Sequence, residues 1–531
     1  MKRQPHLLIL GAGVMQLPAL RLARQQGWYV LAADADSQAP GVALADRFVH
    51  IDLRDRQALL SFARGLRRRS GLDGVFTAGT DFSTSVAWVA EGLGLPGVDY
   101  QTALNASDKQ RMRTVLAAAG VPSPRFCALD DVPDGRVTQQ VVAKTGIPAV
   151  VKPVDSMGAR GVLRVERIEH LAAAVSEALA YSARRRVVVE QFVTGSEFSI
   201  DAVVWNGVLH MCGVADRDIR FAPYFVEVGH TMPTSVEGQA LQNVVDVFTR
   251  AVAALGIRNG AAKGDVFLGP QGPIIGEIAA RLSGGYMSGW TYPLASGVEP
   301  TLAAMRIALG MEPGDLEPRR QRVSVERAII SIPGIVRSIS GFKRARRACY
   351  VAEVFQRCEV GHRVVFPRNN VEKCGNIICC ADVHADAREA ALAAVSEIEI
   401  GLEPGDPETI AFLFGNGDRA GLAAYPELMR AVIDQGRAAG RRRQSRHSGP
   451  IDAVDAAQRD WNGRSLQRTL ETLDPQRCMK QTPVIKDLRP ADTDRVRRLF
   501  WRALAKGGLQ GGRFLLDTIK EIPTWRERLP A

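Results

Sequence analysis

The stretch GPIIGEIAARLSGGY, residues 272–286, places charged side chains at the end of an apolar run. The run leads to Glu277 and Arg281, and the small residues Ser283, Gly284 and Gly285 follow. Buried charges are costly unless they are paired or hold a metal ion. Glu277 and Arg281 are therefore either a structural ion pair or part of a ligand site, and the rest of the chain bears on that choice.

Before this stretch, residues 6–105 alternate short apolar runs with helix-like segments. HLLILGAG reads as a strand that ends in a glycine turn, MQLPALRLARQQG as a helix that stops at Gly27, and WYVLAADAD and GVFTAGTDF as further strands. This alternation predicts a doubly wound parallel sheet of the α/β class. Ligands of such sheets bind at the carboxyl ends of the strands, where GAG, DAD and GTD lie.

The first glycine turn does not fit a dinucleotide site. Gln16 occupies the place of the third glycine in that fingerprint, and its bulk opposes close packing of helix on strand. The amino terminus of the helix can still receive an anion. Asp34 and Asp36 are either site residues or ordinary turn acceptors.

Composition narrows the class of protein. A chain of 531 residues predicts three or four domains, and its 46% hydrophobic content is typical of a soluble globular protein. No apolar run reaches the roughly 18 residues needed to cross a bilayer, so we expect a cytoplasmic protein without a membrane partner. The net charge of +11 comes from separate arginine-rich stretches without interleaved aromatic residues, which favours solvated faces over nucleic-acid binding. The eight cysteines lack the paired spacing of a zinc site, so we expect reduced thiols.

The segment VVKPVDSMGARGV contains the best candidate for phosphate binding. Lys152 ends an apolar run, and the loop that follows contains Gly158 and Gly161. Glycines allow backbone N–H groups to approach phosphoryl oxygens. A plain hairpin turn explains the loop about as well, because the Walker motif is absent from the chain.

The order of these segments, from about Gly11 to Met311, resembles the ATP-grasp superfamily. The resemblance implies ATP bound between two lobes, Mg²⁺ (or Mn²⁺) on Asp265 and Glu277, and Arg281 beside the transferred phosphoryl group. The nucleotide-binding residues that it implies are Lys109, Lys152, Ser156, Gly158, Gly161, Glu190, Gln191, Val193 and Glu197. One departure is Ala279, which stands where many members have an asparagine that also binds metal.

Three segments further resemble the L-amino acid ligases: GAGVMQLP at the start, FVEVGHTMPTSV at 225–236, and the unit from VERAIISIPGIV to the helix DAREAALAAVSEIE. This resemblance implies an ATP-dependent ligase that joins a small carboxylate to an amine through an acyl phosphate. Glu227 and His230, in the segment similar to an active-site loop, are implied to contact the amine or the acyl phosphate. For both residues, and for His230 in particular, an exposed turn pair is the alternative. We also expect a homodimer.

Two other functions remain open. One is a carboxylase-like or purine-biosynthesis-like enzyme that makes carboxyphosphate, and the other is a nucleotide-binding scaffold without catalysis. The expected domains are the doubly wound domain at 1–105, the ATP-grasp domain at 106–311 (small lobe about 115–188, large lobe about 189–311), an α+β domain at 312–415 and a helical, arginine-rich tail at 416–531. The tail either packs or mediates oligomerisation, or it docks a partner.

Overall fold

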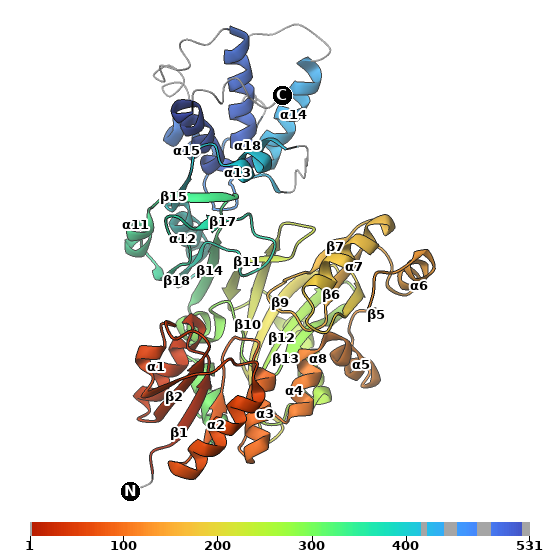
Figure 1. Ribbon diagram of the computed structural model, residues 1–531, viewed down its shortest axis with the longest axis vertical. Coiled ribbons are helices and arrows are strands. Elements are labelled where there is room, and N and C mark those ends of the chain that lie inside the picture. Colours follow the sequence, from red (N-terminus) through yellow and green to blue (C-terminus); the bar gives the residue numbers. More distant parts are fainter. Residues whose placement is uncertain (1–2, 416–421, 440–453, 475–489, 523–531) are drawn as a thin grey trace. The chain divides into compact units, whose positions relative to one another are not determined.

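The computed structural model describes residues 3–415, 422–439, 454–474 and 490–522 (Figure 1). The chain divides into two compact units. Unit 1 comprises Met1–Asp218, Gly229–Val325 and Cys380–His384, and unit 2 comprises Ile219–Val228, Glu326–Cys379 and Ala385–Ala531. The finer division into four domains stays a prediction.

Unit 1 begins with four parallel strands, β1 (His6–Leu10), β2 (Tyr29–Asp34), β3 (Arg47–His50) and β4 (Gly74–Phe76), in the order β3-β2-β1-β4 (Figure 1). Leu7 and Ile9 pack in one core with residues of α1 (Leu17–Gln25). Leu8 and Leu10 pack in another with residues of α2 (Arg56–Arg69) and α3 (Ser83–Leu93). Since successive side chains leave opposite faces of a strand, both faces of this sheet are covered. The predicted doubly wound sheet is confirmed.

Gln16 has a specific role at the first turn. It lies in the short helix η1 (Val14–Gln16), where its side-chain amide donates to the carbonyl of Ala78 at 2.6 Å and accepts from the N–H of Ala78 at 3.0 Å. Gly11 has φ +108°, and a Cβ there would lie 3.0 Å from the Gln16 side chain. Gln16 therefore fastens the first turn to the loop after β4.

The segment SDKQRMRTVLAAAG predicts a helix with Ser107 and Asp108 as its capping residues and Gly120 as its stop. The structure confirms this helix as α5 (Lys109–Ala118), and the extended backbone of Asp108 separates it from α4 (Tyr100–Ser107). The Asp108 carboxylate accepts from the backbone N–H of Arg111, as expected of an N-cap. The predicted end of the helix near Gly120, at φ +63°, agrees with the structure.

The small lobe is an antiparallel sheet of β5 (Phe126–Leu129), β8 (Val187–Gln191), β6 (Ala149–Pro153) and β7 (Leu163–Val165), in the order β5-β8-β6-β7. Helices α6 (Gly135–Thr145) and α7 (Leu171–Ala180) pack against these strands. The glycine loop connects β6 to β7. The small lobe therefore presents Lys152, in β6, and Glu190, in β8, on adjacent strands.

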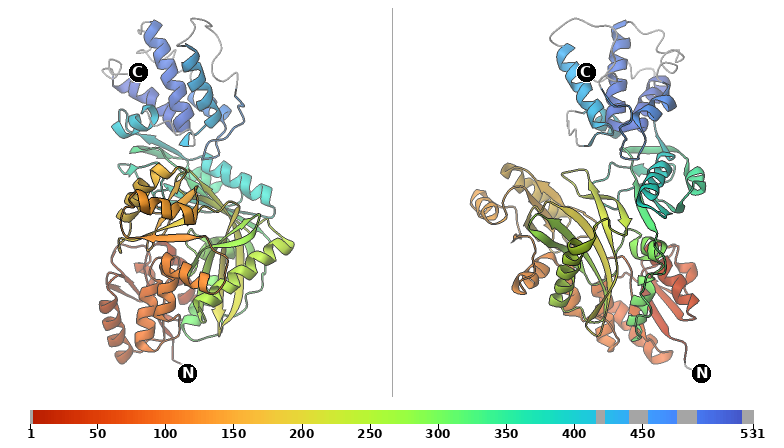
Figure 2. Two further views of the ribbon diagram at one scale, coloured as in Figure 1. Left: turned by 90° about the vertical axis from the view of Figure 1, so that its right-hand side faces the viewer. Right: turned by 180° about the vertical axis from the view of Figure 1, so that it is seen from behind.

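The large lobe is built on β13 (Gly272–Ala279), β12 (Gly260–Gly269), β9 (Ser196–Trp205) and β10 (Val208–Arg220), in that order. Helix α8 (Gly238–Leu255) packs on one face of the sheet, where Phe248 joins Phe198 and Ile200 in a core (Figure 2). Strand β11 (Val226–Met232) crosses the division between the units. After β13 come η4 (Met287–Thr291), α9 (Tyr292–Ser296) and α10 (Pro300–Ala308).

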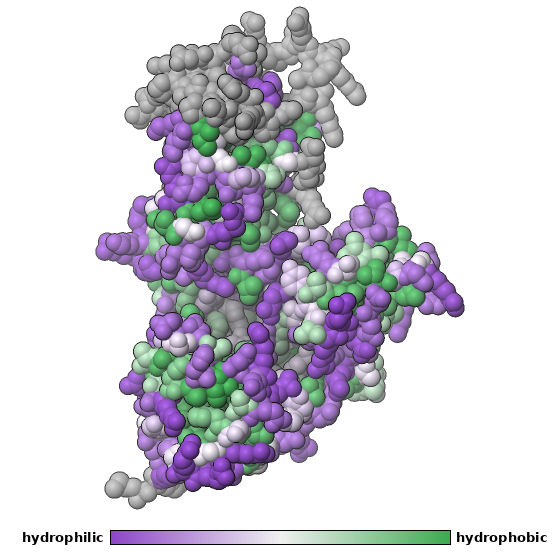
Figure 3. All heavy atoms as spheres, viewed as in Figure 1, coloured by the Kyte–Doolittle hydropathy of each residue, from purple (hydrophilic) through white to green (hydrophobic). Residues whose placement is uncertain are grey.

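The surface gives little indication of a large apolar patch. On the face drawn in Figure 3, hydrophilic side chains predominate and apolar ones form small groups between them. Large exposed apolar residues such as Val14, Val208 and Val360 are scattered along the described chain, which is ordinary for a protein surface. Among the described helices, none combines the length and the apolar character needed to span a bilayer.

Unit 2 contains two groups of strands. One is β17-β15-β19, built from β15 (Gly334–Ser340), β17 (Arg363–Val364) and β19 (Glu399–Leu402). The other is β14-β18-β16, built from β14 (Val323–Ile329), β16 (Val351–Gln356) and β18 (Gly375–Ala381). Helices α11 (Phe342–Arg347), α12 (His384–Ser396) and α13 (Pro407–Phe414) complete this α+β part, and α12 agrees with the predicted helix.

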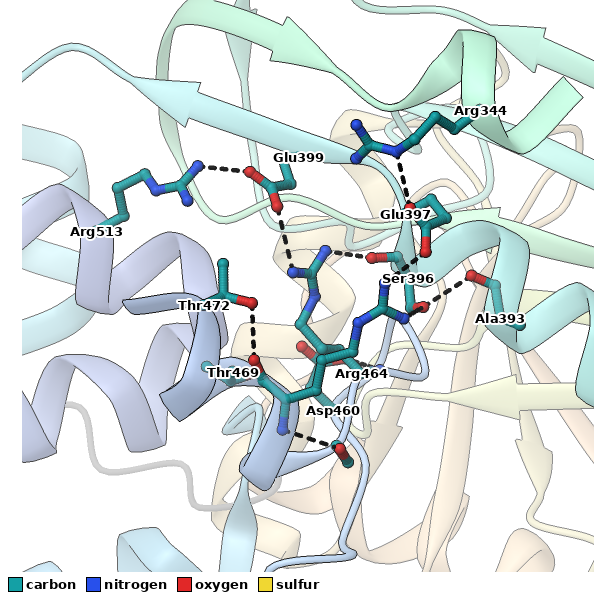
Figure 4. Close-up of polar contacts among 12 residues, drawn as sticks. Arg344, Ala393, Ser396, Glu397, Glu399, Asp460, Arg464, Thr469, Thr472 and Arg513 are labelled. Carbon is teal, nitrogen blue, oxygen red and sulfur yellow. Dashed lines mark hydrogen bonds and ion pairs between the residues drawn. The ribbon is translucent and has the colours of Figure 1, made fainter. Parts of the chain in front are cut away.

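The described part of the tail belongs to unit 2. Helices α14 (Pro426–Ala439), α15 (Leu466–Leu473) and α18 (Pro490–Glu521) pack together, and α18 also contacts α13 and β19. Figure 4 shows two arginines reaching Glu399: Arg513 at 2.6 Å and the buried Arg464 at 3.4 Å. These contacts show packing of the tail on β19. The stretch GRRRQSRHSGP, residues 440–450, predicts a linker, and it lies outside the described residues, as does Trp525.

Candidate nucleotide and metal site

One face of the large-lobe sheet carries the predicted metal ligands. Phe198 and Ile200 of β9 face the core beneath α8. The side chains of the residues that alternate with them, such as Ser199, therefore lie on the opposite face of the sheet. On β12, Asp265 stands in register with Ser199 of β9 and with Glu277 of β13. The two predicted ligands are thus cross-strand neighbours, close enough to share one ion.

A β-bulge at Gly276 sets the position of Glu277. Asp265 pairs with Glu277 and Val266 pairs with Ile275, so Gly276 is an extra residue in β13. A Cβ at Gly276 would lie 2.6 Å from the Phe267 ring, which explains the glycine. Bulges of this kind redirect the neighbouring side chain.

Helix α5 holds the bulged strand on both sides of Glu277. Arg113 Nη2 donates to the Gly276 carbonyl at 2.6 Å. The N–H of Ile278 donates to Met112 Sδ at 3.1 Å. The bulge carbonyl therefore has a charged donor as its partner, and the strand is fixed where it presents the carboxylate.

The electrostatics of Glu277 and Asp265 suit a divalent cation. Burial acts to raise the pKa of Glu277, but nearby cations, Lys109 first, lower it to about 2. Asp265 Oδ2 lies 2.5 Å from Lys263 Nζ and 3.1 Å from Arg217 Nη1. Asp265 Oδ1 is buried and has no hydrogen-bond partner among the described residues.

This donor set fits Mg²⁺. Magnesium is commonly bound through one or two carboxylates, with phosphates and water as its other ligands. The chain supplies two carboxylates here, and the unused Oδ1 of Asp265 is an oxygen without another role. In the described ranges, no group of three or more His, Cys, Asp or Glu side chains could hold a metal ion by itself.

Arg281 points one of its donors to the glycine loop. Its Nη2 lies 3.1 Å from Met157 Sδ, and its Nη1 donates to the Leu282 carbonyl at 2.9 Å. Its Nε is buried without a partner in the described part of the chain. No ion pair joins Arg281 to Glu277 within those residues, so the structural ion pair considered from the sequence is absent.

The predicted phosphate ligands converge near the same loop. Lys109, at the start of α5, donates from Nζ to the carbonyl of Ser156 at 2.7 Å. Gly158 and Gly161 have φ of +65° and +70°, so both are in the left-handed region that the glycine prediction required. Arg160, between them, pairs with Asp81 at 2.8 Å and thereby ties the loop to the doubly wound domain.

Lys152 and Glu190, which begins the hinge that the resemblance implies between the two lobes (190–197), form an ion cluster with Arg113. Lys152 Nζ lies 2.8 Å from Glu190 Oε2, and Arg113 Nε lies 2.8 Å from Glu190 Oε1. The exposed fractions of the Arg113 and Glu190 side chains are 0% and 1%. Burial acts to raise the pKa of Glu190, but Arg113 and Lys152 lower it to about 2.

The other hinge residues lie where β8 passes into β9. Gln191 ends β8, Val193 follows in the connection, and Glu197 is near the start of β9. Glu197 pairs with Arg217 at 2.7 Å, and Arg217 also reaches Asp265. One guanidinium therefore links a hinge carboxylate to a candidate metal ligand.

Sequence reasoning missed four charged residues of this region: Arg113, Lys263, Arg217 and Asp201. Arg113 carried a signal, because it lies four residues after Lys109 on the same helix face. Asp201 is fully buried, and it accepts from the N–H of Ser283 at 2.8 Å. Burial raises the pKa of Asp201 to about 6. Its place in an apolar strand was the only hint.

Glu227 and His230 both lie in strand β11 and are buried, so the exposed-turn alternative for His230 is wrong. The segment is a strand where a loop was expected. In unit 2, the backbone N–H of Glu227 donates to Asn370 Oδ1 at 2.9 Å, and the backbone carbonyl of Glu227 accepts from Lys373 Nζ at 3.0 Å. His230 belongs to unit 1. Their roles toward a substrate stay predictions.

Known proteins share parts of this chain. The chain is 27% identical over 380 residues to the uncharacterized protein y4rH of Sinorhizobium fredii, covering 71% of this chain and 78% of that one. It is 27% identical to carnosine synthase 1 of Mus musculus, covering 58% and 40% of the two chains. It is 32% identical to a D-alanine–D-alanine ligase of Desulforudis audaxviator, covering 36% and 65%. The chain thus spans less than two thirds of both named enzymes.

Fold and family comparisons agree. The crystal structure of an L-amino acid ligase from Bacillus licheniformis has a TM-score of 0.66 at 24% identity, covering 76% of this chain and all of that one. Residues 145–289 match the ATP-grasp domain, and residues 327–403 match the L-amino acid ligase C-terminal domain 2. The chain therefore contains an ATP-grasp domain, followed by the C-terminal domain 2 of the L-amino acid ligases.

Proposed function

We propose that the protein is an ATP-dependent carboxylate–amine ligase that forms an amide bond and releases ADP and phosphate. The observation that carries the proposal is the pairing of Asp265 with Glu277 across adjacent strands, with Arg281 four residues later. Two named relatives, carnosine synthase and D-alanine–D-alanine ligase, suggest amino-acid-type substrates. The match to an L-amino acid ligase domain supports the same substrate class.

The proposed first step transfers phosphate to the carboxylate substrate. A carboxylate oxygen attacks the γ-phosphorus of ATP, the bond to the β–γ bridging oxygen breaks, and ADP leaves. Lys109 and Lys152 contact the phosphates, since a lysine that already has one partner keeps further N–H donors. Arg281, with its unused buried Nε, donates to the charge that develops on the transferred group.

Asp265 and Glu277 would hold Mg²⁺, which when bound neutralises phosphate charge and orients the phosphates. The glycine loop excludes water, so that the acyl phosphate reacts with an amine rather than being hydrolysed. Met157, which contacts Arg281, belongs to this loop. The glycine loop and Arg281 are therefore both placed, in this proposal, next to the position where the acyl phosphate forms.

The proposed second step forms the amide. The amine nitrogen attacks the acyl carbon, the carbon–oxygen bond to phosphate breaks, and the nitrogen loses a proton. Glu227 and His230 are our candidates for contacts to the amine or to the acyl phosphate. We place the reaction in the cytoplasm, where ATP is available, and expect a homodimer, with Mn²⁺ able to replace Mg²⁺.

A substrate screen tests the proposal. The purified protein is incubated with ATP, Mg²⁺ and pools of amino acids, and released phosphate is measured. We expect phosphate only when a carboxylate and an amine are both present, with a matching amide product detected by mass spectrometry. Phosphate release that needs bicarbonate instead would favour the carboxyphosphate enzyme, and tight ATP binding without turnover would favour a scaffold.

A further inference from the structure

Lys263 occupies an unusual position beside the two candidate metal ligands. It lies two residues before Asp265 on β12, so both side chains leave the same face of the sheet. Its Nζ lies 2.5 Å from Asp265 Oδ2. A fixed positive charge thus adjoins Asp265, which stands in register with Glu277, before any metal binds.

The residue opposite Lys263 leaves room for this charge. Ala279 on β13 stands in register with Lys263, as Glu277 stands in register with Asp265. Ala279 is buried, and its methyl group offers neither a hydrogen-bond acceptor nor an oxygen ligand. On this face of the sheet, one cross-strand pair therefore consists of two carboxylates, Asp265 and Glu277. The next pair consists of the Lys263 ammonium and the Ala279 methyl group.

We infer that Lys263 serves as a built-in cation of the metal site, in the place where a second metal ion would otherwise lie. Two carboxylates carry two negative charges, and Lys263 offsets one of them. One divalent ion, bound through Asp265 Oδ1 and Glu277, then meets the phosphates of ATP. This inference rests on the proposed ATP-binding function and deepens it: the site takes one Mg²⁺ per nucleotide.

Arg217 does not serve equally well as this cation. Its guanidinium already pairs with Glu197 at 2.7 Å and lies farther from Asp265, at 3.1 Å. Its strand, β10, is separated from β12 by β9. Lys263, in contrast, itself stands opposite Ala279, and its Nζ lies 2.5 Å from Asp265 Oδ2. The lysine is therefore the group whose removal would open space and negative charge for a second ion.

Counting bound metal tests the inference without catalysis. Mn²⁺ is titrated into the full-length protein saturated with a non-hydrolysable ATP analogue, and free Mn²⁺ is measured by electron paramagnetic resonance. We expect one Mn²⁺ per chain in the unaltered protein, and two per chain would overturn the inference. This count depends on no variant, so it holds even if a substitution impairs folding.

The variant Lys263→Met removes the charge and keeps most of the side-chain length. We expect Mn²⁺ to bind this variant about tenfold more tightly, because a repelling neighbour is lost, or with a second ion per chain. The rate of phosphate transfer should fall at the same time, since no ammonium then offsets the negative charge of the Asp265 carboxylate. If Lys263 had only a structural role, its removal would not tighten metal binding, so an unchanged Mn²⁺ titration would overturn the inference.

Two controls accompany this variant. Lys263→Arg keeps the charge and should retain one Mn²⁺ per chain. Lys144→Met removes an exposed lysine of α6 and should leave the titration unchanged. The outcome is separate from the ligase proposal, because Mn²⁺ and nucleotide bind without an amine. A protein that binds one Mn²⁺ with the analogue but forms no amide would contradict only the proposed reaction.

Discussion

At the scale of single residues, Lys152 and Arg281 are both cations of the proposed site but differ in their partners. Lys152 pairs with Glu190, whereas Arg281 keeps an unused buried Nε. Lys152→Ala should remove a ground-state phosphate contact and raise the KM for ATP roughly tenfold, while Arg113 still neutralises Glu190. Arg281→Met should instead lower kcat by about 100-fold with the KM for ATP nearly kept.

Initial rates with ATP varied at fixed carboxylate and amine concentrations distinguish these two effects. Nucleotide binding measured by calorimetry gives an independent check on the KM values. Equal weakening of ATP binding in both variants would show that the division of roles between Lys152 and Arg281 is wrong.

Asp201 gives a prediction about pH. Burial raises its pKa from an ordinary 3.8 to about 6. Its favourable contribution to stability is therefore complete below about pH 3.8 and is lost as the pH rises through 6. Above pH 6 the buried carboxylate costs about 2–3 kcal/mol.

Asp201→Asn cannot ionise and still offers an oxygen to the Ser283 N–H. It should raise the melting temperature by a few degrees at pH 8 and change it little at pH 4. Scanning calorimetry at several pH values measures this. The exposed Asp246→Asn on α8 is the matched control and should show no such trend. An equal shift at both pH values would contradict the raised pKa.

At the scale of elements, α5 connects the small-lobe strand β8 to the bulged strand β13. Arg113 bonds Glu190 on one and the Gly276 carbonyl on the other. Arg113→Met leaves the buried Glu190 carboxylate with Lys152 as its remaining partner among the described residues, and the bulge carbonyl without its donor. We expect a loss of about 3–5 kcal/mol in the free energy of unfolding.

Denaturant unfolding followed by tryptophan fluorescence measures this loss. Nucleotide binding should weaken with it, because the bulge that positions Glu277 loses its charged donor. Arg111→Met, an exposed change on the same helix, should cost less than about 0.5 kcal/mol. If the Arg113 and Arg111 variants were equally stable, the helix would not be the connection that we describe.

At the scale of the whole molecule, the nucleotide residues and the tail belong to different units. Every residue assigned to ATP or metal lies in unit 1, whereas α14, α15 and α18 lie in unit 2. A chain that ends at Gly415 would leave Glu399 without Arg464 and Arg513 and would expose the surface beneath α18. We expect this chain to bind ATP analogues within about twofold of the full-length affinity but to unfold unit 2 at a lower temperature.

Calorimetric binding and a thermal scan on both chains check this expectation. Loss of nucleotide binding in the shortened chain would contradict the placement of the site in unit 1. Retained binding with loss of amide formation would show that unit 2 contributes to the substrate step, where Glu227 is a candidate.

The sequence by itself determined the features that depend on neighbours along the chain. Apolar runs and glycine turns predicted the doubly wound sheet, because strand and helix periodicity are local. The glycines after Lys152 indicated a phosphate-binding loop, and the resemblance to the ATP-grasp superfamily implied a metal site at Asp265 and Glu277, which stays a prediction. The helix start after Asp108 was predicted as well, because an N-cap side chain acts on the backbone of the turn that follows it.

Only the tertiary structure decided which charges meet. Arg113 reaches Glu190 and Gly276 across sequence separations of 77 and 163 residues. Lys263 lies opposite Ala279 because one bulge shifts the register of β13 by a residue. A shift of one residue moves every later side chain to the other face of a strand, and no local pattern fixes it. Strand pairing and burial, which involve the whole fold, therefore determine the electrostatics of the site.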